Sequence, residues 1–486
     1  MAWVGRCDVG HRASFTKEMS SIGRAVDYLR GTVVAFAGCS RFGSLPRRTS
    51  RETTSLAVTF TPGTPTPAAC RMHQPTRHME RMFVFATISL VAVMACGNPP
   101  QVAVDAASSG DAEADARPAE ADARPAESLS QLPLGNHLGM QASYELLPTG
   151  TAAALAARQQ EAVAAGMKVA RVHVSWGELE PTAGQFDLSS LTDGLSQTVP
   201  ADAAVLLLLE TIDSESFQLP RDLIDPERPY RLAQDRRFDD PVVLARFDAL
   251  IEAVLPVLAG RRVFAIAVGN EPDNFLDDVA PSSEEGRAWV AALAGFTMHA
   301  RDRFHARLPG VAVGMTLRQK SIERGIDTLG SILEASDVAI FNYYCQDEAS
   351  QIEDAARVGP HLDQLLAAAG ELPVVLQELG CPAGPGDSSP SLLAATEAKQ
   401  AAYLAAVASR MRSEPRLRAA FWFTGVDWSP ALTAITTDAL RDAGYPELAA
   451  QFEESLRSCG LLRYEDGSIR PSWSELVAAI GSLRGS

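Results

Sequence analysis

The feature that most constrains this chain is a regular alternation of apolar runs and amphipathic segments over its C-terminal 350 or so residues. Eight runs have the length and apolar content of strands buried on both faces of a parallel sheet, namely residues 134–142, 169–176, 204–210, 263–270, 311–317, 338–344, 373–378 and 419–424. Helical periodicity lies between them, most clearly over residues 151–165, 241–258, 284–307 and 392–412. Gly166, Gly260 and Gly370 stand where helices would end. Eight such units predict an α/β fold, a (β/α)₈ TIM barrel.

A doubly wound open sheet is the alternative fold, but no glycine-rich fingerprint follows the first strand run. Hydrophobic residues make up 46% of the chain and charged residues 21%, which excludes a wholly disordered or fibrous protein. The net charge of −17 argues against a nucleic-acid partner. Seven cysteines without a CxxC pair exclude a disulfide-built scaffold and a zinc site. The sequence contains no nucleophile elbow, phosphate loop or metal cluster, so we expect no cofactor.

The N-terminal part of the chain differs in composition from the rest. Residues 1–78 carry eleven Lys and Arg against four Asp and Glu, and they show little periodicity, so no packed domain is expected there. We interpret residues 1–71 as a disordered extension or one foreign to the native protein, because Met72, Met79 and Met82 each offer a start before an export signal. A long transit peptide is the alternative, and it would leave Cys96 without a role.

Residues 72–96 have the pattern of a signal peptide. Two arginines precede an apolar run, residues 82–95, that is too short to span a bilayer comfortably. The sequence Val-Met-Ala-Cys ending at Cys96 resembles the lipobox of bacterial lipoproteins. This resemblance implies that Cys96 is lipidated and that the exported protein is anchored to the cell envelope. A secreted protein without the anchor is the alternative. A buried helix or an uncleaved anchor is the competing interpretation. Residues 97–132 repeat Ala, Asp, Glu and Pro and predict an extended linker before a folded domain at 133–486.

Two carboxylates stand at the ends of predicted strands. The fourth strand run ends in Asn270-Glu271-Pro272, and the seventh ends in Gln377-Glu378. Active sites of such barrels lie at the C-terminal ends of the strands. Two carboxyl groups that face each other there are what glycoside hydrolysis requires, one as acid and the other as nucleophile or base. A solvated rim position would explain either residue alone, but the pair favours catalysis.

The region from about Leu134 to Leu483 resembles the clan A glycoside hydrolases, a group of retaining enzymes built on (β/α)₈ barrels. Asn270-Glu271-Pro272 resembles their fourth-strand motif, which implies that Glu271 is the general acid/base and that Asn270 binds the sugar 2-hydroxyl. The resemblance likewise implies that Glu378 is the nucleophile and that Arg171, in the second strand run, supports it. A guanidinium inside an apolar strand needs a partner, and Glu378 would supply one.

The sixth and eighth strand runs also match this family. The sixth contains Asn342, Tyr343 and Tyr344, and the family's sixth-strand tyrosine touches the nucleophile. Tyr344 fits the spacing better, although a register shift of one residue would exchange it with Tyr343. Asn342 occupies a position where many relatives have histidine, so the sequence does not decide which residues contact the sugar there. The resemblance places Trp422 at the floor of the sugar site, and a core position is the equal alternative.

The sequence leaves the roles of three further features undecided. His173 shares a strand face with Arg171, and a satisfied core or rim histidine is the favoured interpretation. Glu210 ends the third strand run, where many relatives have histidine, and we favour a solvated rim acid over a sugar ligand. Cys345 and Cys381 follow neighbouring strands, so an exported protein could join them, but the sequence does not decide it.

Two functional hypotheses follow from these features. The leading one is a retaining glycosidase at the cell surface that cleaves an oligo- or polysaccharide, without a cofactor, by double displacement. The alternative is a catalytically silent barrel that binds glycans or serves as a structural envelope lipoprotein, because a fold does not fix a function.

Overall fold

The computed structural model describes residues 136–142, 147–197, 199–200, 202–214, 216–277, 279–386 and 389–483. The chain divides into two units, Met1–Glu80 and Arg81–Ser486, and every described residue belongs to the second. The predicted extension, signal peptide and linker, with Cys96, lie outside the described residues. Within the described part, no helix is both long and apolar enough to cross a bilayer.

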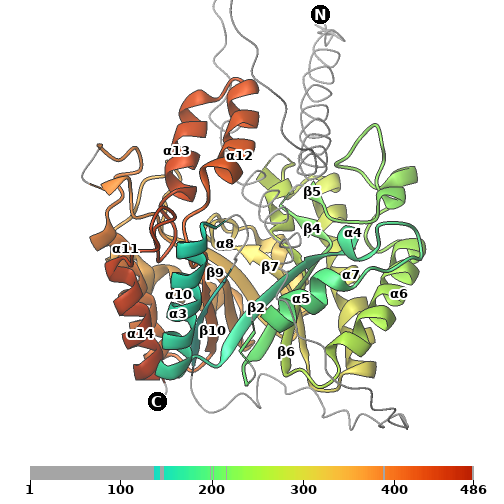
Figure 1. The fold of residues 1–486 in the computed structure, drawn as a ribbon. Helices are drawn as coiled ribbons and strands as arrows, with labels where there is room; N and C mark the ends of the chain where they lie inside the picture. Colours follow the sequence, from blue (N-terminus) through green and yellow to red (C-terminus); the bar gives the residue numbers. More distant parts are fainter. Residues whose placement is uncertain are drawn as a thin grey trace, which may run out of the picture. The chain divides into compact units, whose positions relative to one another are not determined.

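Eight parallel strands form the barrel predicted from the sequence (Figure 1). They are β1 (His137–Met140), β2 (Val169–Ser175), β3 (Ala204–Glu210), β6 (Val263–Asn270), β7 (Ala312–Arg318), β8 (Ala339–Tyr344), β9 (Val374–Gly380) and β10 (Leu417–Trp422). Their hydrogen-bonded order is β1-β10-β9-β8-β7-β6-β3-β2, and β1 lies beside β2. The sequence does not signal the short hairpin β4 (Ile212–Asp213) and β5 (Ser216–Phe217), which extends the sheet beyond β3.

Helices follow the strands and cover the outside of the barrel. The longer ones are α3 (Thr149–Ala165), α5 (Ser189–Gln197), α6 (Pro241–Leu258), α7 (Glu284–Arg307), α10 (Val358–Ala368), α11 (Glu397–Ser413) and α14 (Pro471–Leu483), and the short α4 (Trp176–Leu179), α8 (Gln319–Glu323) and α9 (Gly330–Glu334) lie between them. Gly166 ends α3 in a left-handed conformation, as predicted. The predicted start of α11 at Leu392 is wrong, because Thr396 caps the helix by accepting a hydrogen bond from the Lys399 N–H.

The core has two layers, set by the alternation of side chains along each strand. Inward-facing residues such as Leu208, Ile340 and Phe421 fill the barrel, and the residues between them pack outward against the helices. Within β2 and at the C-terminal end of β3 the inward positions become polar, as with Arg171 and Glu210. This alternation decides which side chains reach the candidate site.

Trp422 belongs to the outer layer, so of its two equal alternatives the core position holds and the floor of a sugar site does not. The side chain is fully buried, its Nε1 donates a hydrogen bond to the Cys459 carbonyl at 3.1 Å, and its ring lies 6.2 Å from that of Tyr403. The inward position on this strand is taken by the preceding residue, Phe421. The strand period therefore turns Trp422 away from the barrel axis.

The chain between β10 and α14 forms a hairpin of two helices, α12 (Pro430–Asp442) and α13 (Pro446–Leu456). This hairpin stands over the strand ends (Figure 1). Its apolar face packs on Phe423 and Trp428, and Tyr344 lies against the same cluster. At its base, Asp427 and Arg470 form a buried ion pair at 2.8 Å. The hairpin thus covers the β8–β10 side of the strand ends.

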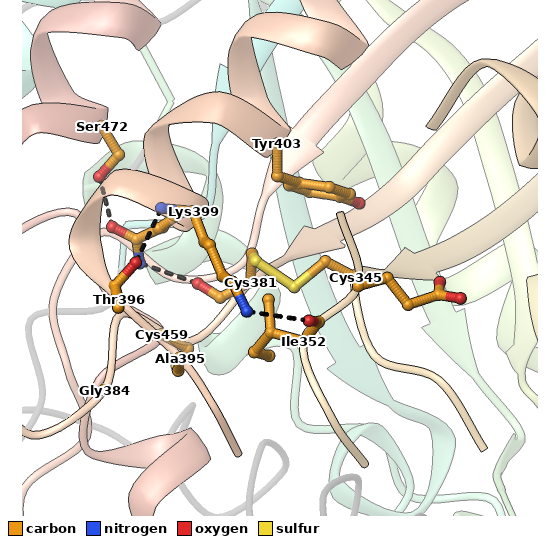
Figure 2. Close-up of a disulfide and its surroundings, with 12 residues drawn as sticks. Cys345, Ile352, Cys381, Gly384, Ala395, Thr396, Lys399, Tyr403, Cys459 and Ser472 are labelled. Carbon is orange, nitrogen blue, oxygen red and sulfur yellow. Dashed lines mark hydrogen bonds between the residues drawn. A yellow bond between two sulfur atoms is a disulfide. The ribbon is translucent and has the colours of Figure 1, made fainter. Parts of the chain in front are cut away.

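A disulfide joins Cys345 and Cys381, the residues that directly follow β8 and β9 (Figure 2). The Cys345 N–H also donates to the Gly380 carbonyl at 3.1 Å. The loop after Cys345 is held at its far end, where the Ile352 carbonyl accepts a hydrogen bond from Lys399 Nζ at 3.3 Å. Strand ends and loop are therefore tied together beside the candidate site.

Replacing both bridging cysteines, as Cys345→Ala with Cys381→Ala, is expected to lower the free energy of unfolding by about 2–4 kcal/mol, because the bridge restricts the unfolded chain. Chemical denaturation with and without a thiol reductant measures this. The reductant should lower the wild-type midpoint and leave that of the double variant unchanged. Equal midpoints for the oxidised wild type and the double variant would contradict the prediction.

Candidate active site

Glu271 and Glu378 both lie at the C-terminal end of the barrel, and each is only 5% exposed. Glu378 stands within β9, whereas Glu271 follows β6 and has a left-handed backbone with φ of 49°. A non-glycine residue adopts this conformation only where the surroundings enforce it. Here the Glu271 N–H donates to the Thr316 carbonyl at 2.9 Å, which holds the turn in place.

Two donors hold the Glu378 carboxylate. Arg171 Nη2 lies 2.8 Å from Oε1, and the Tyr344 hydroxyl donates to Oε2 at 2.5 Å. The predicted Arg171–Glu378 contact is therefore confirmed. Arg171 also donates to the side chain of Gln141, at the end of β1. Charge-assisted hydrogen bonds of this kind stabilise the ionised form of a carboxyl group.

The register of β8 decides between the two tyrosines in favour of Tyr344. Tyr343 points outward, where its hydroxyl lies 3.2 Å from His361 Nδ1. Tyr344 reaches Glu378 only because residue 380 is glycine: a Cβ there would lie 2.3 Å from the Tyr344 ring. Burial, followed by the charge of Glu378, raises the pKa of Tyr344 well above its usual value, so the hydroxyl stays a donor.

Glu271 is held in a different environment. Asn342 Nδ2 donates to its Oε1 at 2.7 Å, and the Ser214 hydroxyl lies 3.3 Å from Oε2. Burial, and then the charge of Glu378, raises the pKa of Glu271 to about 8. At that pKa the Glu271 carboxyl group carries a proton at neutral pH.

Asn270 is locked by neighbours that sequence reasoning missed. Its Nδ2 donates to Asp213 Oδ1 at 2.9 Å, and its Oδ1 accepts from Gln377 at 2.9 Å and from Asn342 at 3.0 Å. Gln377 carried a usable signal, since it is a polar residue near the end of an apolar strand run. Asp213 did not, because it lies in the unpredicted hairpin that follows β3.

Glu210 is buried, so the prediction of a solvated rim acid is wrong. It is 1% exposed, and its Oε2 lies 2.9 Å from His173 Nε2. Burial raises the pKa of Glu210 well above its usual value, whereas burial and the charge of Arg171 lower the pKa of His173 to about 4. Both effects favour a neutral pair that shares one proton next to Arg171.

Phe423 is the aromatic residue of the β10 end that lies toward the site. Its ring is 6.3 Å from that of Tyr344 and 6.3 Å from that of Trp428. The family resemblance points instead to its neighbour Trp422, for which a core position is the equal alternative. The side chain that borders Tyr344 is one position further along the chain.

An open pocket lies on the Glu271 side of the site. The polar side chains at the ends of β7 and β8 line it together with Glu271: Arg318, Gln319, Lys320, Arg324, Asn342, Tyr344, Gln346, Asp347, Glu348 and Ser350. Glu378 is not among them. The pocket therefore extends away from the nucleophile candidate and past the acid candidate.

No protein-family model matches the chain, and a comparison with curated proteins finds no relative. Solved structures do resemble it. The exo-beta-1,4-mannosidase Op5Man5 from Opitutaceae bacterium strain TAV5 shares 16% identity over 75% of this chain and 62% of its own, with a TM-score of 0.51. A GH5_18 protein from Bifidobacterium longum subsp. longum ATCC 55813 shares 15% identity over 72% of this chain and 80% of its own, with a TM-score of 0.51. A GH5_18 protein from Bifidobacterium longum subsp. infantis shares 15% identity over 73% of this chain and 80% of its own, with a TM-score of 0.50. At these identities the likeness shows the fold alone, a (β/α)₈ barrel.

The raised pKa of Glu271 predicts a pH-dependent effect of Glu271→Gln on stability. In the folded wild type the carboxyl group stays protonated up to about pH 8, whereas in the unfolded chain it ionises near 4.5. The ionisation of Glu271 alone therefore lowers the stability of the wild type as the pH rises from 5 to 8, and the variant, which lacks this carboxyl group, is spared that loss. The variant should gain on the order of a few kcal/mol relative to wild type over this range. Denaturation of both proteins at pH 5 and pH 8 measures the difference, and a constant difference would refute the shifted pKa.

Proposed function

We propose that this protein is a retaining glycoside hydrolase in which Glu378 is the nucleophile and Glu271 the general acid/base. One observation carries the proposal: the two carboxyl groups of the site lie at the same end of the barrel and are held by different kinds of partner. Glu378 accepts hydrogen bonds from Arg171 and Tyr344, whereas the pKa of Glu271 is raised to about 8. A carboxylate beside a protonated carboxylic acid is the starting state that glycoside hydrolysis with retention needs.

The first step forms a glycosyl-enzyme. A Glu378 oxygen attacks the anomeric carbon, and the bond from that carbon to the leaving oxygen breaks. Glu271 gives its proton to the leaving oxygen, so the leaving group departs as a neutral alcohol. Arg171 and Tyr344 keep the attacking carboxylate oriented, at 2.8 Å and 2.5 Å respectively.

The second step reverses these roles. Glu271, now ionised, removes a proton from water while the water oxygen bonds to the anomeric carbon. The ester bond to Glu378 breaks and its carboxylate is restored, again paired with Arg171. Asn342, 2.7 Å from Glu271, donates to the carboxylate that exists only between the two steps. The sugar leaves with the configuration that it had in the substrate.

The fold neighbours suggest which substrate to test first. One of them is named an exo-beta-1,4-mannosidase, and a variant of the Bifidobacterium longum subsp. longum protein is seen in complex with Manb1-4GlcNAc. A β-mannoside is therefore the first glycoside to supply, within a screen of activated aryl glycosides. A protein that binds such glycans but turns over none of them would favour the silent barrel.

Nucleophile and acid variants should respond differently to azide. Glu378→Ala is expected to lose turnover, and azide should restore it as a glycosyl azide of inverted configuration, because the anion fills the space left by the carboxylate. Glu271→Ala should still form the glycosyl-enzyme from substrates with good leaving groups, and azide should then give a product of retained configuration. NMR of the products distinguishes the two outcomes.

The same pair of variants can contradict the assignment. Wild-type turnover in either variant would refute the role of that residue. Equal loss in both, with neither rescue by azide nor a trapped intermediate, would refute the two-carboxylate mechanism. Glu210→Gln is a useful control because Glu210 is also a buried glutamate at a strand end. Azide should not give a glycosyl azide with that variant.

We further propose that the protein works outside the cytoplasm, anchored through Cys96. The disulfide between Cys345 and Cys381 supports an oxidising compartment, since such bonds are rare in the cytosol. Mass spectrometry of protein from the native host should find a lipid-modified N-terminus at residue 96. Cys96→Ser should lack the lipid. A mature wild-type chain that retains the residues before Cys96, without lipid, would overturn this proposal.

A further inference from the structure

The disulfide between Cys345 and Cys381 (Figure 2) lies directly next to the contact between Tyr344 and Glu378. Cys345 follows Tyr344 in the chain, and Cys381 comes three residues after Glu378. The Cα atoms of the two cysteines are 5.2 Å apart, and both side chains are buried. The bridge therefore closes the ends of β8 and β9 beside the residue that we propose as the nucleophile.

The pairing of β8 with β9 is irregular shortly before this point. Phe341 pairs with Leu376, but Asn342 pairs with Glu378, so Gln377 is left out of the register. A bulge of this kind disrupts the ladder of hydrogen bonds locally and changes the direction of the side chains that follow it. Three residue pairs come after the bulge before both strands end. Glu378 therefore stands on a short paired segment that the bulge separates from the rest of the ladder.

Tyr344 reaches Glu378 diagonally across this short segment. Its own partner in β9 is Gly380, whereas Glu378 is the partner of Asn342. The tyrosine ring lies against Gly380, where a Cβ would be 2.3 Å from it, and its hydroxyl donates to Glu378 Oε2 at 2.5 Å. The place of the hydroxyl therefore depends on how closely the strands approach at Tyr344 and Gly380, and the disulfide joins the next residue of each strand.

Beyond their last residue pair the two strands separate. The Cys345 N–H donates to the Gly380 carbonyl at 3.1 Å, and the chain that follows β9 then turns toward Ser458, whose carbonyl accepts from the Ala383 N–H at 2.8 Å. Local opening starts most readily where ordered pairing ends. The disulfide is a covalent link across this place, so it limits how far Tyr344 can move from the carboxylate.

We propose that the Cys345–Cys381 disulfide positions the Tyr344 hydroxyl on Glu378, and that the rate of turnover therefore depends on the bridge. Both cysteines are positioning residues, because they act through Tyr344. This inference rests on the proposed glycosidase function and adds a role in catalysis to the stabilising role of the bridge. A displacement of about 1 Å at a reacting group can lower a rate about a hundredfold, so a restraint on the partner of a nucleophile affects the chemical step.

A double-mutant cycle separates this role from a general effect on the structure. It compares wild type, Cys345→Ala with Cys381→Ala, Tyr344→Phe and the triple variant, each assayed for kcat/KM with 4-nitrophenyl β-mannoside well below its unfolding midpoint. Tyr344→Phe should lose about tenfold to a hundredfold, the effect of one hydrogen bond to a charged group. Removing the bridge should cost about fivefold to tenfold while Tyr344 is present, and nothing further in Tyr344→Phe.

Cys459→Ala is the matched control, because Cys459 is also a buried cysteine but lies outside the bridge. Its kcat/KM should equal that of wild type. An equal loss from removal of the bridge in both backgrounds would mean that the bridge acts through general stability or through the neighbouring loop, and it would overturn the proposal. Wild-type turnover without the bridge would overturn it as well.

If the double alanine variant does not fold, folded wild type and folded Tyr344→Phe, each reduced with tris(2-carboxyethyl)phosphine, take its place in the cycle. The phosphine is oxidised to its oxide with the oxygen of water, and the bridge becomes two thiols, which are counted by labelling. The same two comparisons then support or overturn the proposal.

A structural measurement separates this proposal from the proposed function. Failure of wild type on every aryl glycoside would count against the glycosidase, and crystal structures with and without the bridge then test the positioning alone. Without the bridge, the Tyr344 hydroxyl should lie farther from Glu378 than in the bridged wild type. An unchanged contact between Tyr344 and Glu378 would overturn the positioning role.

Discussion

The buried ion pair between Arg171 and Glu378 is the interaction on which the rest of the site depends. Both side chains are almost inaccessible, and an unpaired charge in such a place would cost several kcal/mol. The barrel therefore has to bring β2 and β9 into a fixed relation, with Gln141 and Tyr344 as further partners. The same contacts fix the orientation of the Glu378 carboxylate, which the proposed mechanism requires of a nucleophile.

The electrostatic balance around this pair sets the state of the second carboxyl group. Glu271 cannot share Arg171 with Glu378, and burial together with the charge of Glu378 keeps it protonated. The adjacent Glu210 and His173 form a neutral pair, so they do not compete for the arginine. Arg171 thus forms its ion pair with Glu378, whereas Asn342 donates to Glu271 and His173 lies against Glu210.

The connections at the C-terminal end of the barrel give the site its surroundings. The α12–α13 hairpin packs on Phe423 and Tyr344 and covers one side. The loop held by the disulfide of Cys345 leaves an open pocket on the other side, beside Glu271. Loops that are restrained by covalent and polar contacts can present hydrogen-bonding groups to a substrate with little loss of entropy.

The sequence by itself determined the strands, the parallel barrel, the strand ends at which Glu271 and Glu378 lie and the strand that contains Arg171, because these follow from apolar runs and from the cost of burying charge. Tertiary structure decided what depends on strand phase and on contacts distant in sequence. It turned Trp422 outward, brought Phe423 toward the site, buried Glu210 against His173 and joined Cys345 to Cys381. The physical reason is that a shift of one residue reverses the direction of every side chain on a strand, and no local pattern fixes that phase where both faces are apolar.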